Sequence, residues 1–185
     1  MLVIGIAAVL SRTEARLRIR LAVREAVAQW LAIDMQSISV ESQPGHAPRL
    51  LLAGRAAWLS ISHDDGISLA AIHLHGPVGI DVMRVQEIAD WHQVTRDYLG
   101  PQVVAHLRAC PDAQRPLAMA QAWTAREAAL KCAGLALAEW DEDALNCDLR
   151  ALEMPQDFVA MLATSWGQTR RGNTSRWDVF RSRSD

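Results

Sequence analysis

The order of apolar and polar residues predicts a strand and then a long helix at the start of the chain. The stretch "MLVIGIAAVL" has no positive charge before its apolar run and no convincing cleavage site, so we interpret it as a buried strand rather than a secretory signal. In residues 12–32, apolar positions recur at helical spacing. These positions are Leu17, Leu21, Val23, Val27 and Leu31. Ser11 or Thr13 is expected to cap the helix, with Glu14 in the first turn, where the helix dipole favours an anion.

The middle of the chain has the pattern of short strands separated by turns. Residues 37–41 ("SISVE") and 57–62 ("AWLSIS") are strand-like, and the loop 42–49, rich in Pro and Gly, lies between them. The second of these strands is expected to end at His63, where the turn "HDDG" begins. Beyond it, "ISLAAIHL" and "VGIDVM" flank "HGP", which predicts a compact hairpin in the middle of the fold.

The second half again goes from a strand through helices to strands. Residues 85–109 predict two short helices broken at "GP", and a long helix is expected from Pro116 to about Cys132, ended by a nearby glycine. The tail carries two strand-like pieces, "FVAMLAT" and "SRWDVF". The pattern therefore predicts an α+β fold built from two similar halves, residues 1–76 and 77–185.

Composition narrows the class of protein. A chain of 185 residues suits one domain or two small halves that share a core. Its net charge of -2 argues against a nucleic-acid partner, although the arginine-rich run "RTEARLRIRLAVR" leaves room for a local basic pocket. The cysteines (Cys110, Cys132 and Cys147) have no paired or metal-type spacing, which favours a reducing compartment. No apolar stretch is long enough for a membrane span, so we expect a cytoplasmic protein.

One lysine stands out, because Lys131 is the only lysine in the chain. It follows Glu127 by four residues and Trp123 by eight, so all three share one helix face. A Glu–Lys pair at this spacing is typical of a surface ion pair. The neighbouring tryptophan and alanines do not give a solvated face, so an active-site role is the alternative.

Two further motifs could carry chemistry. Asp81 interrupts an apolar strand, where a carboxylate either bonds to a turn or is paired with a cation. Together with Glu127 it would offer the two carboxylates that suit Mg²⁺ beside a substrate phosphate. Ser62 and His63 end a strand, either as ordinary loop residues or as phosphate contacts. No Gly-x-Ser-x-Gly elbow supports a serine hydrolase.

Two histidines and two further acids are possible metal ligands. His73 and His75 alternate along a strand as zinc ligands sometimes do, but no third ligand lies at a helpful spacing. Asp64 and Asp65 fit a solvated turn better than a metal site.

The order of "SISH", "VGIDV" and "WTAREAALKCAGLAL" resembles the 4′-phosphopantetheinyl transferase superfamily. The segment "ADWHQVTRDYLGPQVVAHL" and the loop "PGHAPRL" are also similar to the family, so the resemblance spans roughly residues 15–140. Spacing and length are most similar to the monomeric, two-halved (Sfp-like) type. The resemblance implies two pseudo-symmetric α+β halves with the active site between them.

The resemblance also implies an activity: transfer of 4′-phosphopantetheine from coenzyme A to a serine of an acyl or peptidyl carrier protein, with release of adenosine 3′,5′-bisphosphate. Asp81 and Glu127 are implied to hold Mg²⁺, or Mn²⁺, on the pyrophosphate. Glu127 is implied to accept the serine proton and Lys131 to contact the phosphate. Ser62 and His63 are implied to contact the 3′-phosphate and adenylate side of coenzyme A. Arg12, Arg16, Arg20 and His46 are candidates for further charge, with Arg16 preferred.

Three positions depart from the family pattern. Most two-halved members have a second acid two residues after the strand aspartate, where this chain has Met83, a poor Mg²⁺ ligand. Arg126 replaces a lysine, and Ala47 stands where the loop lysine is expected, so His46 is expected to substitute with a pH-dependent charge. Met83 and Ala47 leave open a non-catalytic homologue that only binds coenzyme A or carrier protein. A third possibility is an α+β domain without this activity, in which Glu127 and Lys131 form only a surface ion pair.

Overall fold

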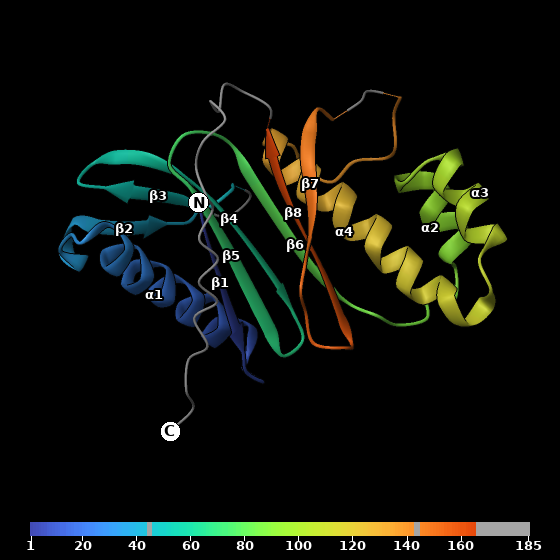
Figure 1. The fold of residues 1–185 in the computed structure, drawn as a ribbon, viewed down its shortest axis with the longest axis horizontal. Helices are drawn as coiled ribbons and strands as arrows, with labels where there is room; N and C mark the ends of the chain where they lie inside the picture. The colour runs from blue at the N-terminus through green and yellow to red at the C-terminus, as the bar shows by residue number, and fades with distance from the viewer. Residues whose placement is uncertain (44–45, 143–144, 166–185) are drawn as a thin grey trace.

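The computed structural model describes residues 1–43, 46–142 and 145–165, and within them the chain folds into an α+β structure with two antiparallel sheets (Figure 1). The first sheet has the strand order β1-β5-β4-β3-β2. Its strands are β1 (Leu2–Ala7), β2 (Ile38–Glu41), β3 (Arg49–Leu52), β4 (Arg55–Asp64) and β5 (Ile67–His73). Helix α1 (Arg12–Leu31) covers one face of this sheet, and a short 3-10 turn, η1 (Met35–Ser37), follows the helix.

The second sheet has the order β6-β8-β7, and its long covering helix is α4. The elements of this part are β6 (Val78–Arg84), α2 (Trp91–Tyr98), α3 (Pro101–Ala109), η2 (Asp112–Gln114), α4 (Arg115–Ala133), β7 (Cys147–Leu152) and β8 (Phe158–Ser165). The predicted first strand, the break between the two short helices and the strand "FVAMLAT" are confirmed. The piece "SRWDVF" lies outside the described residues.

Local signals explain where the helices start and stop. Ser11, not Thr13, is the N-cap of α1: its hydroxyl accepts from the backbone N–H of Glu14, whose carboxylate accepts from the Ser11 N–H. Helix α4 begins with a proline in its first turn and ends at Gly134, which adopts a φ of 72°. No helix in the described residues is both long and apolar enough to cross a membrane.

The buried face of α1 is only in part the predicted one, because Val23 and Val27 are buried as expected but Leu17 and Leu21 are not. Ile19, Val23 and Val27 are fully buried, whereas Leu17 and Leu21 are 60% and 45% exposed. Two residues span about 200° of an α-helix, so a buried stripe through positions 19, 23 and 27 turns positions 17 and 21 to solvent. The predicted set had mixed two faces of the helix.

The predicted hairpin between β5 and β6 is wrong. β5 pairs with β1 and β4 in the first sheet, whereas β6 pairs with β8 in the second. The "HGP" segment instead carries the chain from one sheet to the other, and His73 Nδ1 lies 2.9 Å from the carbonyl oxygen of Gly76 there. The local turn signal was real, but the partner of β6 is supplied by residues 158–164, far along the chain.

The two sheets share a core. A buried cluster combines Ile67, Leu69 and Ala71 of β5 with apolar residues of β6 and β8. These partners are Val78, Ile80, Val82, Ala160 and Leu162. Strand β6 therefore belongs to the second sheet but packs against the first, so its apolar side chains in this cluster lie between the two sheets.

Candidate active site

A close approach between α4 and β6 brings the candidate residues together. A Cβ atom added at Gly79 would lie 1.9 Å from the carbonyl oxygen of Ala128 and 2.6 Å from the backbone nitrogen of Cys132. The helix backbone therefore rests directly on the strand at this glycine. Asp81 lies two residues further on the same strand face, so the α4 side chains at 127 and 131 are brought next to its carboxylate.

Lys131 is held between two carboxylates. Its Nζ lies 2.6 Å from Asp81 Oδ1, 3.8 Å from Glu127 Oε2 and 3.3 Å from the carbonyl oxygen of Ile80. The side chains of Lys131 and Glu127 are 29% and 18% exposed, and that of Asp81 is 9% exposed. The reading as a solvated surface pair does not fit this burial. The stronger ionic contact also runs to Asp81, fifty positions away, rather than to the neighbour on the same helix.

Burial and charge shift the ionisation of this group of residues. Burial raises the pKa of Glu127, as does the negative charge of Asp81, while the positive charge of Lys131 opposes the rise. A half-buried carboxylate with a raised pKa is a common feature of catalytic sites.

Side chains of β4 bind the backbone of β6. Ser60, Ser62 and Asp64 alternate along β4 and so face the same way. They accept hydrogen bonds from successive alternate N–H groups of β6: Ile80 to Ser60 (3.0 Å), Val82 to Ser62 (3.3 Å) and Arg84 to Asp64 (2.5 Å). We call this set the side-chain ladder. It joins the two sheets where no backbone pairing between β4 and β6 exists in the described part of the chain.

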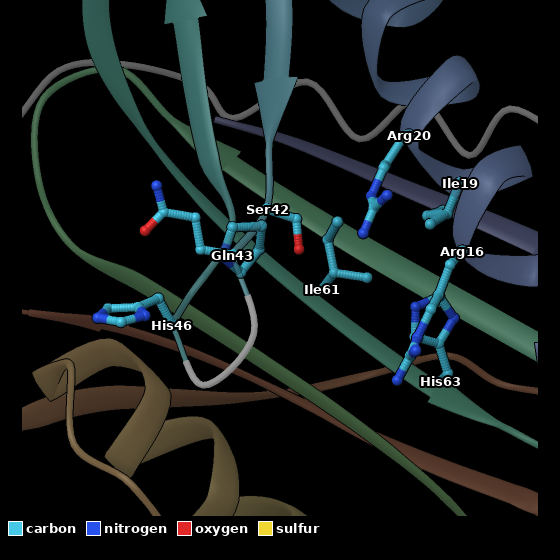
Figure 2. Close-up of a pocket in the computed structure, with 9 residues that line it drawn as sticks. Arg16, Ile19, Arg20, Ser42, Gln43, His46, Ile61 and His63 are labelled. Carbon is cyan, nitrogen blue, oxygen red and sulfur yellow. The ribbon is translucent and has the colours of Figure 1, made fainter. Parts of the chain in front are cut away.

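Basic residues of α1, β4 and the loop after β2 form the neighbouring wall (Figure 2). Arg16 and Arg20 extend from α1, His63 from β4, and His46 lies on the loop. They line a cavity of about 540 Å³ together with Ile19, Ser42, Gln43, Pro48 and Ile61. His63 Nδ1 lies 2.8 Å from Ser68 Oγ, which fixes the ring. Burial, and then the charges of Arg16 and Lys131, hold the pKa of His63 below its ordinary value.

This basic cavity adjoins the one that holds the carboxylates. Arg16, Ile61 and His63 line both. The second cavity is also lined by Arg12, Ser62, Asp64, Asp81, Val82, Met83, Gln86, Ile88, Val94, Trp123, Glu127 and Lys131. The cavities are bordered by the seven residues that the resemblance implied for the site, namely Arg16, His46, Ser62, His63, Asp81, Glu127 and Lys131. Arg20 lines the first cavity and Arg12 the second, so all three candidate arginines border the site.

Sequence reasoning missed some members of the site. Gln86 lines the second cavity, and Ser68 holds His63, but neither stands in a recognisable motif. Ser60 could have been noticed, because polar residues that alternate in an otherwise apolar strand signal a buried polar face. Arg126 lines neither cavity, and its Nη2 is 3.8 Å from Asp141 Oδ1.

The donor set is suitable for a magnesium ion. Asp81 and Glu127 supply two carboxylates beside one cavity, and Mg²⁺ is commonly held by one or two carboxylates with water and substrate phosphate. Met83, on the same strand face as Asp81, offers only a thioether there. Among the described residues, no group of three or more His, Cys, Asp or Glu side chains could hold a metal, so the pair His73 and His75 gains no third ligand.

Comparison with known proteins agrees with the motif resemblance. The pattern of the 4′-phosphopantetheinyl transferase superfamily matches residues 77–165, which run from β6 to the end of β8. Over 119 residues the chain is 27% identical to the "Putative 4′-phosphopantetheinyl transferase slr0495" of Synechocystis sp., covering 64% of this chain and 48% of that protein. It is 28% identical over 83 residues to the 4′-phosphopantetheinyl transferase HetI of Nostoc sp., covering 45% and 35% respectively.

These matches identify the protein family that the second half of the chain resembles. With its two antiparallel sheets and their helices, the α+β fold is consistent with that of the superfamily, and Asp81, Glu127 and Lys131 all lie within the matched residues. Over residues 77–165 the chain is similar to the 4′-phosphopantetheinyl transferase superfamily, and both relatives bear the name of that activity. The aligned segments span about half of the length of one curated relative and about a third of the other.

Proposed function

We propose that this protein transfers 4′-phosphopantetheine from coenzyme A to a serine hydroxyl of an acyl or peptidyl carrier protein. The observation that carries the proposal is the meeting of Asp81, Glu127 and Lys131 at one cavity that opens into a second, cationic one. A pyrophosphate with a separate 3′-phosphate has the charge distribution that such a pair of cavities would bind. The similarity of residues 77–165 to the superfamily supports the same reaction class.

The reaction is a phosphoryl transfer, in which a protein mainly positions the reactants and stabilises charge. The serine oxygen forms a bond to the phosphorus on the pantetheine side of the pyrophosphate. The bond from this phosphorus to the bridging oxygen breaks, and adenosine 3′,5′-bisphosphate leaves. Glu127, whose pKa is raised by burial, is placed to accept the serine proton, directly or through water.

Positive side chains have two tasks in this proposal. Lys131 places an ammonium group at the carboxylate end of the site, where it would contact the transferred phosphate as a compact point charge. Arg16, His46 and His63 would bind the 3′-phosphate and adenylate side of coenzyme A, and Ser62 borders the adjoining second cavity. Asp81 and Glu127 would hold Mg²⁺ or Mn²⁺, which supplies charge neutralisation on the pyrophosphate when bound.

The two-halved, monomeric type is also part of the proposal. Three neighbouring strands of the first sheet have the order β1-β5-β4, and the second sheet has the order β6-β8-β7. Each of these pairings is antiparallel. In each case the chain forms a first strand (β1 or β6), then a helix that covers the sheet (α1 or α4), and then the other two strands, of which the later one pairs with the first strand. This parallel supports pseudo-symmetric halves at residues 1–76 and 77–185, with a cytoplasmic monomer as the working form.

The test is intact-protein mass spectrometry of an apo carrier protein incubated with this chain, coenzyme A and Mg²⁺, with and without EDTA. One fatty-acid carrier and one peptide carrier are used. We expect a metal-dependent gain of one phosphopantetheine. Glu127→Gln should lower the rate by about 10²-fold or more, whereas Glu25→Gln, an exposed carboxyl on α1, should not.

A second candidate function is binding without transfer, and Met83 favours it because position 83 supplies no carboxylate for a metal beside Asp81 and Glu127. In that case neither carrier gains mass, while coenzyme A still binds in a calorimetric titration. Full activity of Glu127→Gln would instead reject the role given to that carboxylate.

A further inference from the structure

Ser62 has a hydrogen-bonding position that the family resemblance did not suggest. Its side chain was expected to contact coenzyme A, and it borders the second cavity, yet the residue is only 6% exposed. Its hydroxyl donates to Asp81 Oδ1 at 2.7 Å. We propose that Ser62 is a positioning residue, which holds the Asp81 carboxylate in place for a divalent cation instead of binding the coenzyme itself. The consequence for turnover rests on the proposed transferase function.

The capacity of a hydroxyl supports this assignment. A serine hydroxyl has one proton to donate and two lone pairs to accept with. The proton goes to Asp81, and the acceptor side faces the N–H of Val82 at 3.3 Å and the ammonium of Lys131 at 3.4 Å. Phosphate oxygens mainly accept hydrogen bonds. Ser62 could therefore donate to a phosphate only by giving up its hydrogen bond to the buried Asp81 carboxylate.

The arrangement also determines which oxygen of Asp81 a cation would use. Both Ser62 and Lys131 donate to Oδ1, at 2.7 Å and 2.6 Å. The carboxylate is thereby fixed through one oxygen, and Oδ2 is the oxygen that a divalent cation would coordinate. Hydrogen bonds that orient a metal-binding carboxylate commonly change metal affinity about 10- to 100-fold when they are removed.

The chain contains a matched control for the structural role of Ser62. Ser60 lies two residues away on the same face of β4, is 5% exposed, and accepts the N–H of Ile80 just as Ser62 accepts that of Val82. Both serines belong to the side-chain ladder, but the hydrogen bond to Asp81 belongs to Ser62. Comparing the two alanine variants therefore separates ladder stability from carboxylate positioning.

The experiment is a titration of the purified full chain with Mn²⁺, followed by electron paramagnetic resonance, without coenzyme A or carrier protein. Ser62→Ala should weaken Mn²⁺ binding about 10- to 100-fold relative to the parent. Ser60→Ala should change Mn²⁺ affinity by less than about twofold. Both variants should lose unfolding free energy in urea, because each removes one acceptor of a buried N–H, and Ser62→Ala should lose more because it also removes the hydrogen bond to Asp81. Ser62→Thr keeps the hydroxyl and should restore most of the affinity.

Steady-state kinetics supply the second readout. Under the proposal, Ser62→Ala lowers kcat while the KM for coenzyme A changes little. A raised KM for coenzyme A with unchanged Mn²⁺ affinity would show a coenzyme contact and overturn the proposal. So would equal Mn²⁺ affinity in the Ser62→Ala and Ser60→Ala variants, or a parent chain that binds no Mn²⁺.

The two proposals can fail separately. If Mn²⁺ affinity drops in Ser62→Ala but no carrier protein is ever modified, the positioning role stands and the transferase function falls. If carrier proteins are modified but Ser62→Ala leaves Mn²⁺ affinity unchanged, the transferase function stands and the positioning role falls.

Discussion

Replacing Gly79 by alanine should separate α4 from β6 and take the site apart. The added Cβ would lie 1.9 Å from the Ala128 carbonyl oxygen, and real Cβ contacts essentially never fall below 3.0 Å, so strand and helix must move apart by at least 1.1 Å. Overpacking of this kind typically costs about 1–3 kcal/mol. Because both atoms that the Cβ would meet belong to the helix backbone, which cannot rotate away, we expect a loss of about 3 kcal/mol of unfolding free energy.

The same displacement should affect catalysis more than stability. The contact of 2.6 Å between Lys131 Nζ and Asp81 Oδ1 would lengthen past hydrogen-bonding distance if the helix moved away by this amount. Misplacement of reacting groups by about 1 Å can cost about 10²-fold in rate. Urea unfolding followed by circular dichroism measures the first effect, and initial rates of carrier modification measure the second.

Gly76→Ala is the matched control, because its Cβ would meet its nearest neighbour, the His73 ring, at an ordinary 3.5 Å. It should leave stability and rate close to those of the parent. If Gly79→Ala unfolds at the same urea concentration as Gly76→Ala and retains full activity, then the contact between α4 and β6 does not set the geometry of the site.

Three further predictions concern single side chains. The pKa of His63 is lowered from 6.5, so its contribution to stability is present above pH 6.5 and is lost as the pH falls through the lowered pKa. The free energy of unfolding in urea, measured at about pH 7.5 and about pH 5.5, should therefore change less with pH in His63→Gln than in the parent. Met83→Glu adds a carboxylate on the strand face of Asp81 and should tighten Mn²⁺ binding by about tenfold, measured by the same titration, whereas unchanged affinity would mean that position 83 does not reach the metal. Burial raises the pKa of Cys132 to about 11, so its thiol should react with iodoacetamide far more slowly than that of Cys110 in the native protein, and at similar rates in urea; peptide mass spectrometry reads the labelling.

Tertiary packing also decided the partner of the only lysine. The spacing in the sequence pairs Lys131 with Glu127, since residues four apart are neighbours on a helix. In the structure the ammonium group lies 2.6 Å from Asp81 and 3.8 Å from Glu127. The sequence could name all three residues as members of one site, but the choice of partner depended on how closely α4 rests on β6, which Gly79 permits.

What the sequence by itself determined is local: a helix cap at Ser11 or Thr13 with Glu14 in the first turn, the helix end at Gly134, the helix break at Gly100-Pro101, and the first strand. These features depend on the dihedral preferences and hydrogen bonds of a few adjacent residues. The pairing of β6 with β8, the outward face of Leu17 and the direction of the Ser62 proton were decided only by the tertiary structure. Each depends on surfaces brought together from distant parts of the chain, where burial and the need to satisfy buried polar groups outweigh local preference.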